Sequence, residues 1–212
     1  MFEPLHIRAY MQTGIVSDQF LPLDGIIQYF CLRDRLGFPD YSTPLDTIVD
    51  VSSVELPFEK KEKDGFWYYA CSFAIFPPHT KEFREIYSKR FPLSRIDMLG
   101  PVKKKINTQG GRYKSLYLNV YYRTALWLDW YCVGDRKEIE GLLPHIHWIG
   151  KKVSQGWGAV SKWEINPIAE DWSERKDGQL TRAIPDPDGE FLFGIRPPYW
   201  KTENQTWCIM PE

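Results

Sequence analysis

A run of glycines, cations and one indole in the last third of the chain has the residue types that suit a phosphate backbone. It consists of Gly150, Lys151, Lys152, Val153, Ser154, Gln155, Gly156, Trp157 and Gly158. Glycines let the main chain reach positive φ and bring its N–H groups close to an anion, lysines supply charge, and an indole offers a face on which a base can stack. Glycine followed by lysines also caps ordinary helices. These residues alone therefore do not decide between nucleic-acid binding and simple helix capping. None of them is typical of a catalytic centre.

A second group of cations lies between Lys81 and Lys114. This segment holds ten Lys and Arg against three Asp and Glu, a balance of +7, so the rest of the chain carries −8 of the net charge of −1. A cationic segment on a mildly acidic protein is typical of a molecule that holds one anionic partner on one face. A charged face that only contacts solvent is the alternative. We expect phosphate contacts from Lys103, Lys104, Lys105, Arg112 and Lys114.

Histidines are the residues on which a metal-independent ribonuclease would depend. Such an enzyme needs a general acid or base, commonly His, near a Lys or Tyr that polarises the scissile phosphate. His79, at the start of the cationic segment, is the best-placed base, with Tyr87 or Lys89 as partners. His145 and His147 stand two residues apart at the expected helix end, so we expect their side chains to face different directions and to form no metal pair. We therefore predict a protein that is not an enzyme, with His79-dependent RNA cleavage as the alternative.

Other chemistry finds no support in the sequence. The acidic residues stand loosely spaced in turns, and the chain has no P-loop, GxSxG, HExxH or CxxC motif, so we expect neither a metal nor a cofactor. A carbohydrate-binding or adaptor module would explain the aromatic content of 16%. It would not explain a cationic segment together with a Gly-Lys-Lys loop.

Size and composition describe an ordinary globular protein. With 212 residues, of which 43% are apolar, the chain forms one large domain or two small ones with a sizeable core. The four cysteines, Cys31, Cys71, Cys132 and Cys208, are widely separated and three lie in apolar stretches, which is typical of small buried side chains in a reducing compartment. The chain lacks a signal peptide and a long apolar run, so we expect a cytoplasmic protein without membrane contact.

The first half of the chain predicts a strand, a helix and a second strand. The run His6–Thr13 alternates loosely and predicts a strand, and Asp24 is placed to cap a following helix. Residues 37–63 have the composition of an irregular surface connection, and Phe66–Phe76 is dense enough in apolar side chains to be a buried strand. The cationic segment then predicts a projecting hairpin, because a compact core does not accommodate so much charge.

The second half continues with strands and one further helix. Pro101–Asn107 and Tyr113–Asn119 are the expected strands of the hairpin, and the apolar segment Ser115–Val133 contains two strands or one long bent one. Asp135 is expected to cap a helix over Arg136–Trp148, which the glycine-rich loop connects to a last strand over Ala159–Ile165.

This order of elements is that of a split βαβ, ferredoxin-like α+β fold, related to RNA-recognition domains that bind through the open sheet face and its loops. We place this domain at residues 1–166, with a thumb-like insertion at about 81–115. We expect residues 167–212 to form an irregular but ordered C-terminal tail packed on the domain, because its Trp and Phe content is too high for disorder.

Three stretches resemble the RAMP superfamily of CRISPR effector proteins. They are the segment 21–29 (Leu-Pro-Leu-Asp-Gly-Ile-Ile-Gln-Tyr), the glycine-rich loop 150–158, and Arg182-Ala183-Ile184-Pro185. The greatest similarity is to the fifth-Cas-family subunit of type IV systems. These motifs cover about a quarter of the chain, and the order of elements covers most of it.

The resemblance implies a noncatalytic RNA-binding subunit of a ribonucleoprotein complex for antiviral defence. Such a subunit caps the 5′ handle of the CRISPR RNA (crRNA) and contacts the large subunit and the first backbone subunit of the filament. The resemblance also leaves open a contact with target DNA beside the protospacer. The resemblance assigns RNA binding to the glycine-rich loop 150–158, and the cationic segment takes the position of a thumb.

Overall fold

The computed structural model describes residues 1–36, 54–92 and 107–211, and its centre is an antiparallel sheet. In this sheet β1 (Phe2–Met11) lies between β6 (Trp127–Asp135) and β7 (Val160–Pro167). Residues 70–75 continue the sheet beyond β6 through isolated bridges, which include Cys71 with Cys132 and Ile75 with Asp129. Helices with mostly antiparallel strands agree with the predicted α+β class.

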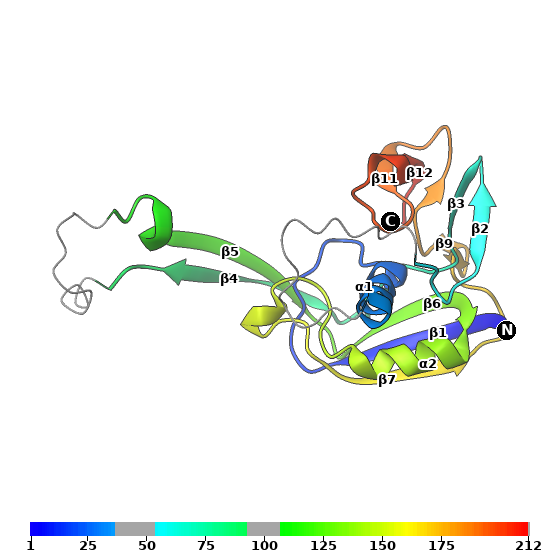
Figure 1. Cartoon of the computed structure of the whole chain (residues 1–212), viewed down its shortest axis with the longest axis horizontal. Helices are drawn as coiled ribbons and strands as arrows, with labels where there is room; N and C mark the ends of the chain where they lie inside the picture. The colour runs from blue at the N-terminus through cyan, green and yellow to red at the C-terminus, as the bar shows by residue number, and fades with distance from the viewer. Residues whose placement is uncertain (37–53, 93–106, 212) are drawn as a thin grey trace.

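The helices α1 (Leu23–Leu36) and α2 (Arg136–Leu142) cover one face of this sheet (Figure 1). Successive strand residues point to opposite faces, so every second side chain of β1 and β6 faces the helices. The resulting core contains Leu5, Ile7, Ala9, Leu128, Trp130, Cys132, Leu23, Ile27 and Ile139. Asp135 Oδ1 accepts the backbone N–H groups of Lys137 and Glu138, which confirms this predicted helix cap.

Two predicted elements have different bounds in the structure. The second helix ends at Leu142, because Pro144 has no N–H group with which to continue the helical hydrogen bonds; a short 3-10 turn, Leu143–His145, follows. The first strand begins at Phe2, four residues before the expected start at His6. Its early residues pair with β6, a partner that local composition does not reveal.

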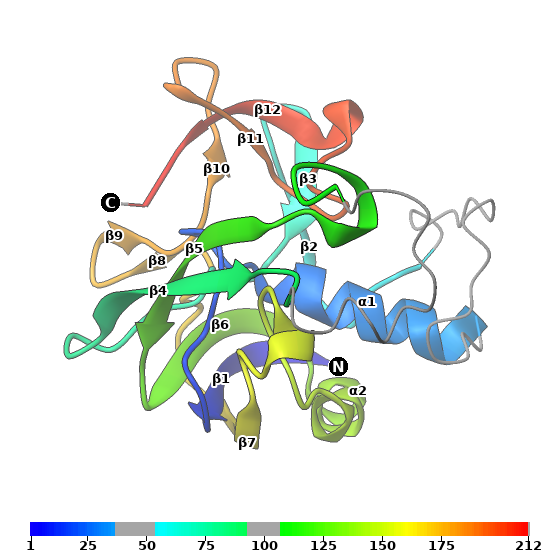
Figure 2. The same ribbon diagram turned by 90° about the vertical axis from the view of Figure 1, so that its left-hand side faces the viewer.

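The cationic segment forms part of a projecting arm, as predicted, but its strands are not the predicted ones. The arm consists of β4 (Lys81–Lys89) paired antiparallel with β5 (Leu116–Thr124), and it extends away from the sheet and helices (Figure 1). Figure 2 views the molecule from the side of the arm. The expected pairing of Pro101–Asn107 with Tyr113–Asn119 is therefore wrong at its second strand, and residues 101–106 lie outside the described part of the chain. Ser115–Val133 does contain two strands, β5 and the start of β6.

The supposed irregular connection contains a strand. β2 (Lys60–Lys63) pairs with β3 (Phe66–Tyr69) around a tight turn at Asp64 and Gly65, both of which have positive φ. An Asp-Gly turn of this kind matches the twist of a hairpin, and this signal was available in the sequence. The predicted strand Phe66–Phe76 accordingly divides into β3 and the bridged residues that follow it. Residues 37–53 of the same prediction lie outside the described part of the chain.

The C-terminal segment is ordered but not irregular. It contains a β8–β9 hairpin and a three-stranded sheet in the order β10-β12-β11. The strands are β8 (Arg175–Lys176), β9 (Gln179–Leu180), β10 (Ile184–Pro185), β11 (Phe191–Gly194) and β12 (Gln205–Ile209). Ala183, Ile184, Ile195 and Cys208 form a second core with Tyr68 and Phe73. These strands are two to five residues long, which is too short to produce a recognisable alternation in the sequence.

Candidate nucleic-acid interface

The glycine-rich loop connects the 3-10 turn after α2 to β7, and two of its glycines are required by close backbone contacts. Gly150 has a φ of +84°, and a Cβ atom there would lie 2.6 Å from the carbonyl oxygen of Val16. Gly158 has a φ of +76°, and its Cβ would lie 1.9 Å from the carbonyl oxygen of Ile149. Gly156 also has positive φ, at +93°, but a Cβ there would meet open space. The loop is therefore held at its two ends and exposed in its middle.

Residues 14–18 attach this loop to the rest of the molecule. The backbone N–H of Gly158 donates to the carbonyl of Gly14 at 2.8 Å, and that of Lys151 donates to Val16 at 2.6 Å. The Lys151 ammonium group contacts Asp18 Oδ1 at 2.6 Å. This ion pair is exposed, so its contribution to stability is small. Lys151 therefore already has an anionic partner, which an RNA phosphate would have to replace.

The same 14–18 segment holds the base of the arm. Ile15 and Arg123 exchange backbone hydrogen bonds at 2.8 and 2.9 Å, and Arg123 Nη2 donates to the Ser17 hydroxyl and to the Asp18 carbonyl. The Arg123 guanidinium also lies 3.8 Å from the centre of the Phe76 ring. Burial lowers the pKa of Arg123, opposed by the nearby Glu82 carboxylate. Arg123 thus serves to fix the arm.

Aromatic rings join the loop directly to the arm. The rings of Trp157 and Tyr122 lie 4.3 Å apart with an angle of 37° between their planes, and Phe83 stacks on Tyr122 with a centroid separation of 5.6 Å. Trp157 is half-buried. Trp157, which we expected to stack on a base, is thus the end of a ring series, and part of its surface is occupied by Tyr122.

The arm exposes both of its faces to solvent. Every residue of β4 is exposed, and large apolar or aromatic side chains on the two strands are 42–65% exposed. These side chains are Phe83, Ile86, Tyr87, Tyr117, Leu118 and Tyr121. Lys81, Arg84, Lys89 and Lys114 add exposed cations among them. Arg112 lies in the 3-10 turn Gly111–Tyr113, which precedes β5, while Lys103, Lys104 and Lys105 lie outside the described residues.

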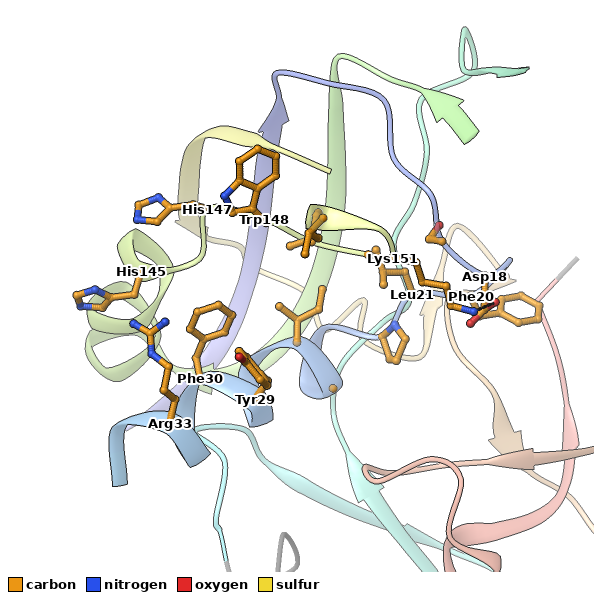
Figure 3. Close-up of a pocket in the computed structure, with 17 residues that line it drawn as sticks. Asp18, Phe20, Leu21, Tyr29, Phe30, Arg33, His145, His147, Trp148 and Lys151 are labelled. Atoms are coloured by element: carbon orange, nitrogen blue, oxygen red, sulfur yellow. Dashed lines mark hydrogen bonds and ion pairs between the residues drawn. The ribbon is translucent and has the colours of Figure 1, made fainter. Parts of the chain in front are cut away.

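A cavity of about 540 Å³ lies between α1 and the chain that leads into the glycine-rich loop (Figure 3). Its lining includes Tyr29, Phe30 and Arg33 of α1, together with Trp148 and Lys151. His145 and His147 also line it, on either side of Ile146. The sequence did not mark α1 as part of the site, because its aromatic residues are spaced like ordinary packing residues of an amphipathic helix.

The predicted partners of His79 do not lie beside it. His79 is exposed and its ring contacts Trp127 at a centroid distance of 5.2 Å. Tyr87 and Lys89 stand on the unbroken strand β4, roughly 20 and 26 Å beyond its start at about 3.3 Å per residue. This constellation for acid–base cleavage is therefore not assembled. In the described ranges, no three His, Cys, Asp or Glu side chains are placed to hold a metal ion.

The sheet face opposite the helices is occupied by internal contacts. Asp129 accepts hydrogen bonds from Arg8 at 2.7 and 2.9 Å and contacts His6 Nε2 at 2.7 Å. Burial acts to raise the pKa of Asp129, but the hydrogen bonds with His6 and Arg8 outweigh it and lower the pKa. Lys176 of the β8–β9 hairpin donates to the Tyr131 hydroxyl at 2.6 Å. The cations of this face are thus already paired.

Two of the stretches behind the RAMP resemblance form a buried structural joint. Asp24 is not a simple helix cap, because it lies buried within the first turn of α1 and its Oδ1 accepts the Tyr199 hydroxyl at 2.5 Å. Burial raises the pKa of Asp24, against the lowering influence of Arg182. The buried Arg182 guanidinium donates to the carbonyl groups of Tyr69, Cys71 and Ile195. This joint connects α1, the residues after β3 and the C-terminal sheet.

All four cysteines are buried free thiols, in agreement with the sequence. Cys71 and Cys132 face each other across the bridge between residues 70–75 and β6. In the described ranges, no helix combines the length and apolar character needed to cross a membrane.

Comparison with known proteins identifies the family. A family model described as CRISPR type IV associated protein Csf3 matches residues 3–211, which is almost the entire chain. No curated protein matches it in sequence. The resemblance to a type IV CRISPR RAMP subunit is thereby confirmed. The chain belongs to the family of CRISPR type IV associated protein Csf3.

Proposed function

We propose that this chain is a noncatalytic RNA-binding subunit of a type IV CRISPR effector complex and that it caps the 5′ handle of the crRNA. The observation that carries the proposal is the junction at residues 14–18, where the glycine-rich loop and the base of the arm meet. Two segments that the sequence marked separately for RNA binding thereby form one continuous surface. A strand of RNA running over the loop would pass directly to the arm.

The chemistry along this surface suits a single-stranded nucleic acid. Exposed cations on the arm neutralise phosphates, and exposed tyrosines such as Tyr117 and Tyr121 offer ring faces to bases. The exposed middle of the loop, from Val153 to Gly156, allows a backbone to approach closely. RNA binding through phosphates and stacked bases needs no catalytic group.

The arrangement of the central sheet is compatible with the ferredoxin-like fold expected for a RAMP domain. The order β7-β1-β6, followed by the bridged residues 70–75, has α1 after β1 and α2 after β6. We propose that this sheet is the RAMP core. Its loops and the arm then bind RNA, since its open face is engaged in internal contacts.

Other subunits of the complex would cover surfaces that remain apolar in the isolated chain. A two-stranded ribbon such as the arm is at best marginally stable alone in water. We propose that the large subunit and the first backbone subunit contact the arm and the C-terminal sheet, where Leu192 and Trp207 are exposed side by side across β11 and β12. Contact with DNA beside the protospacer would use the same assembled surface.

The proposal is tested by a gel-shift experiment with a labelled repeat RNA in the absence of divalent metal, scoring binding and cleavage together. The wild-type chain should bind the RNA and leave it intact, and the Lys103/Lys104/Lys105→Ala variant should bind more weakly. A Lys60/Lys63/Lys137→Ala variant, which removes three exposed lysines outside the loop and arm, controls for net charge. Cleavage that His79→Ala abolishes would identify a processing endoribonuclease instead. Equal weakening by both triple variants would remove the arm's assigned role.

A further inference from the structure

The cavity between α1 and the glycine-rich loop has the size of a site for a small organic ligand. Its volume of about 540 Å³ falls within the range of about 300–1,000 Å³ that is typical of such sites. Gly150 and Lys151 belong both to the loop and to the cavity lining, so the cavity opens beside the surface proposed to hold RNA (Figure 3).

Aromatic side chains of α1 form one wall of the cavity. The ring of Tyr29 lies 5.2 Å from that of Phe30, nearly perpendicular to it, and Tyr29 is 63% exposed. Phe30 is partly buried against the core, which fixes its position, while Ile26 extends the same apolar wall. An exposed ring held beside a fixed one is a surface on which a planar group can stack.

Cationic and hydrogen-bonding groups gather at one end of this wall. Arg33, His145 and His147 all line the cavity, and Figure 3 draws them on the same side of the view. The Arg33 guanidinium lies 5.5 Å from the centre of the Phe30 ring. Asp18, the acidic residue of the lining, lies at the other end and is paired with Lys151. The end near Arg33 therefore favours an anion.

We propose that the cavity binds one unstacked nucleotide of the RNA, with its base on the ring of Tyr29 and its phosphate at Arg33 and the two imidazoles. The inference rests on the proposed function and adds a specific subsite to it. A planar apolar group joined to an anion matches a wall of rings that ends at the Arg33 guanidinium and two imidazoles. The other possible occupant, an apolar side chain from a protein partner, would fill the same wall but leave the cationic end without a counterpart.

The test combines variants of the full-length chain with a series of repeat RNAs, each carrying one abasic site in the 5′ handle. For the wild type, one abasic position should weaken binding by about tenfold, because base–aromatic stacking is of that order. The Tyr29→Ala variant should bind the intact RNA about tenfold more weakly than the wild type does. In this variant the same abasic site should cause little further loss of affinity. This coupling is expected only if that base contacts Tyr29.

Matched variants separate the subsite from general effects. Trp200→Ala removes an aromatic side chain that is 76% exposed and lies outside the cavity, and it should leave the coupling unchanged. Arg33→Gln should weaken the binding of intact RNA, whereas Arg136→Gln on α2 should not.

If RNA binding persists but no abasic position is coupled to Tyr29, the subsite is overturned and the proposed function still stands. No RNA binding by the wild type would overturn both. Loss of a partner subunit from Tyr29→Ala without any change in RNA affinity would assign the cavity to a protein contact.

Discussion

Gly158 and Gly156 are needed for different reasons. Gly158 leaves no space for a Cβ atom, whereas Gly156 is needed only for its backbone conformation. Both have positive φ, which costs roughly 1–2 kcal/mol for other residues, but only Gly158 faces a carbonyl oxygen at a distance that forbids a Cβ. We expect Gly156→Ala to lower the free energy of unfolding by about 1 kcal/mol and Gly158→Ala by clearly more. Urea denaturation of both variants measures the difference. Equal losses would show that the contact with Ile149 relaxes easily.

The buried carboxyl of Asp24 predicts an unusual dependence of stability on pH. Burial raises the pKa of Asp24 in the folded chain, so the fold retains a proton that the unfolded chain releases above its ordinary pKa of about 3.9. Stability contributed by this group is therefore full below about pH 4 and falls as pH rises towards the folded pKa. Arg182, Tyr199, Tyr69 and Cys71 are the titratable neighbours of this carboxyl.

Asp24→Asn tests this dependence because it keeps the shape of the side chain and removes the titration. The free energy of unfolding of the variant, relative to wild type, should rise between pH 4 and pH 7 by about 1.4 kcal/mol for each unit by which the pKa is raised. Urea denaturation at several pH values gives the comparison, with the exposed Glu62→Gln as control for loss of a charge. A constant difference across this range would contradict a protonated Asp24.

The roles of some single residues could be predicted from the sequence, and those of others could not. The glycine-rich loop was predictable because positive φ and close approach restrict the residue type itself. Asp24 was misassigned as a cap because its partner, Tyr199, is 175 residues away. The sequence did not predict Tyr29 and Arg33 as part of the candidate site for a related reason. They line the same cavity only because α1 packs beside the loop in the folded chain.

The arm depends on Tyr122 for its attachment to the loop. Tyr122 packs between Phe83 and Trp157, and such ring pairs contribute about 0.5–1.5 kcal/mol each. Tyr122→Ala should therefore accelerate amide hydrogen exchange at the base of β4 and β5. The adjacent Tyr121→Ala, whose ring is exposed on the other face of the arm, should not. Equal acceleration in both variants would mean that strand pairing, not the ring series, holds the arm.

Phosphate contacts from the arm predict a specific salt dependence. Each neutralised phosphate of a single strand adds about 0.7 to the slope of log affinity against log salt concentration. The Lys103/Lys104/Lys105→Ala variant should thus reduce the slope by about 2, measured by fluorescence anisotropy over a salt series. Trp157→Ala should weaken binding with little change of slope, because stacking releases few ions. An unchanged slope in the lysine variant would remove these residues from the interface.

The arm as an element was predictable from its charge, but its strands were not. Charge density excludes a segment from the core without fixing which residues pair. The actual pairing of Lys81–Lys89 with Leu116–Thr124 joins segments separated by more than 25 residues, so it depends on contacts that local composition does not encode.

Across the entire chain, the order of the main strands and helices followed from hydrophobic patterns, whereas the C-terminal sheet did not. Strands of two to five residues acquire their conformation from their neighbours, here through the buried Arg182 and the core around Ile195 and Cys208. Two of the motifs behind the RAMP resemblance, around Asp24 and Arg182, therefore contribute to architecture. The glycine-rich loop lies on the proposed RNA surface, and Tyr29, the last residue of the motif around Asp24, lines the cavity proposed as a nucleotide subsite.

The most direct measurement is photo-crosslinking of a repeat RNA to the wild-type chain, with the crosslinked peptides identified by mass spectrometry. A continuous RNA path over the loop and the arm predicts adducts at residues 150–158, on β4 and β5, and at Tyr29 beside the cavity. Crosslinks confined to β8–β12 or to the sheet face around Arg8 would contradict the path, because the RNA would then lie on neither the loop nor the arm.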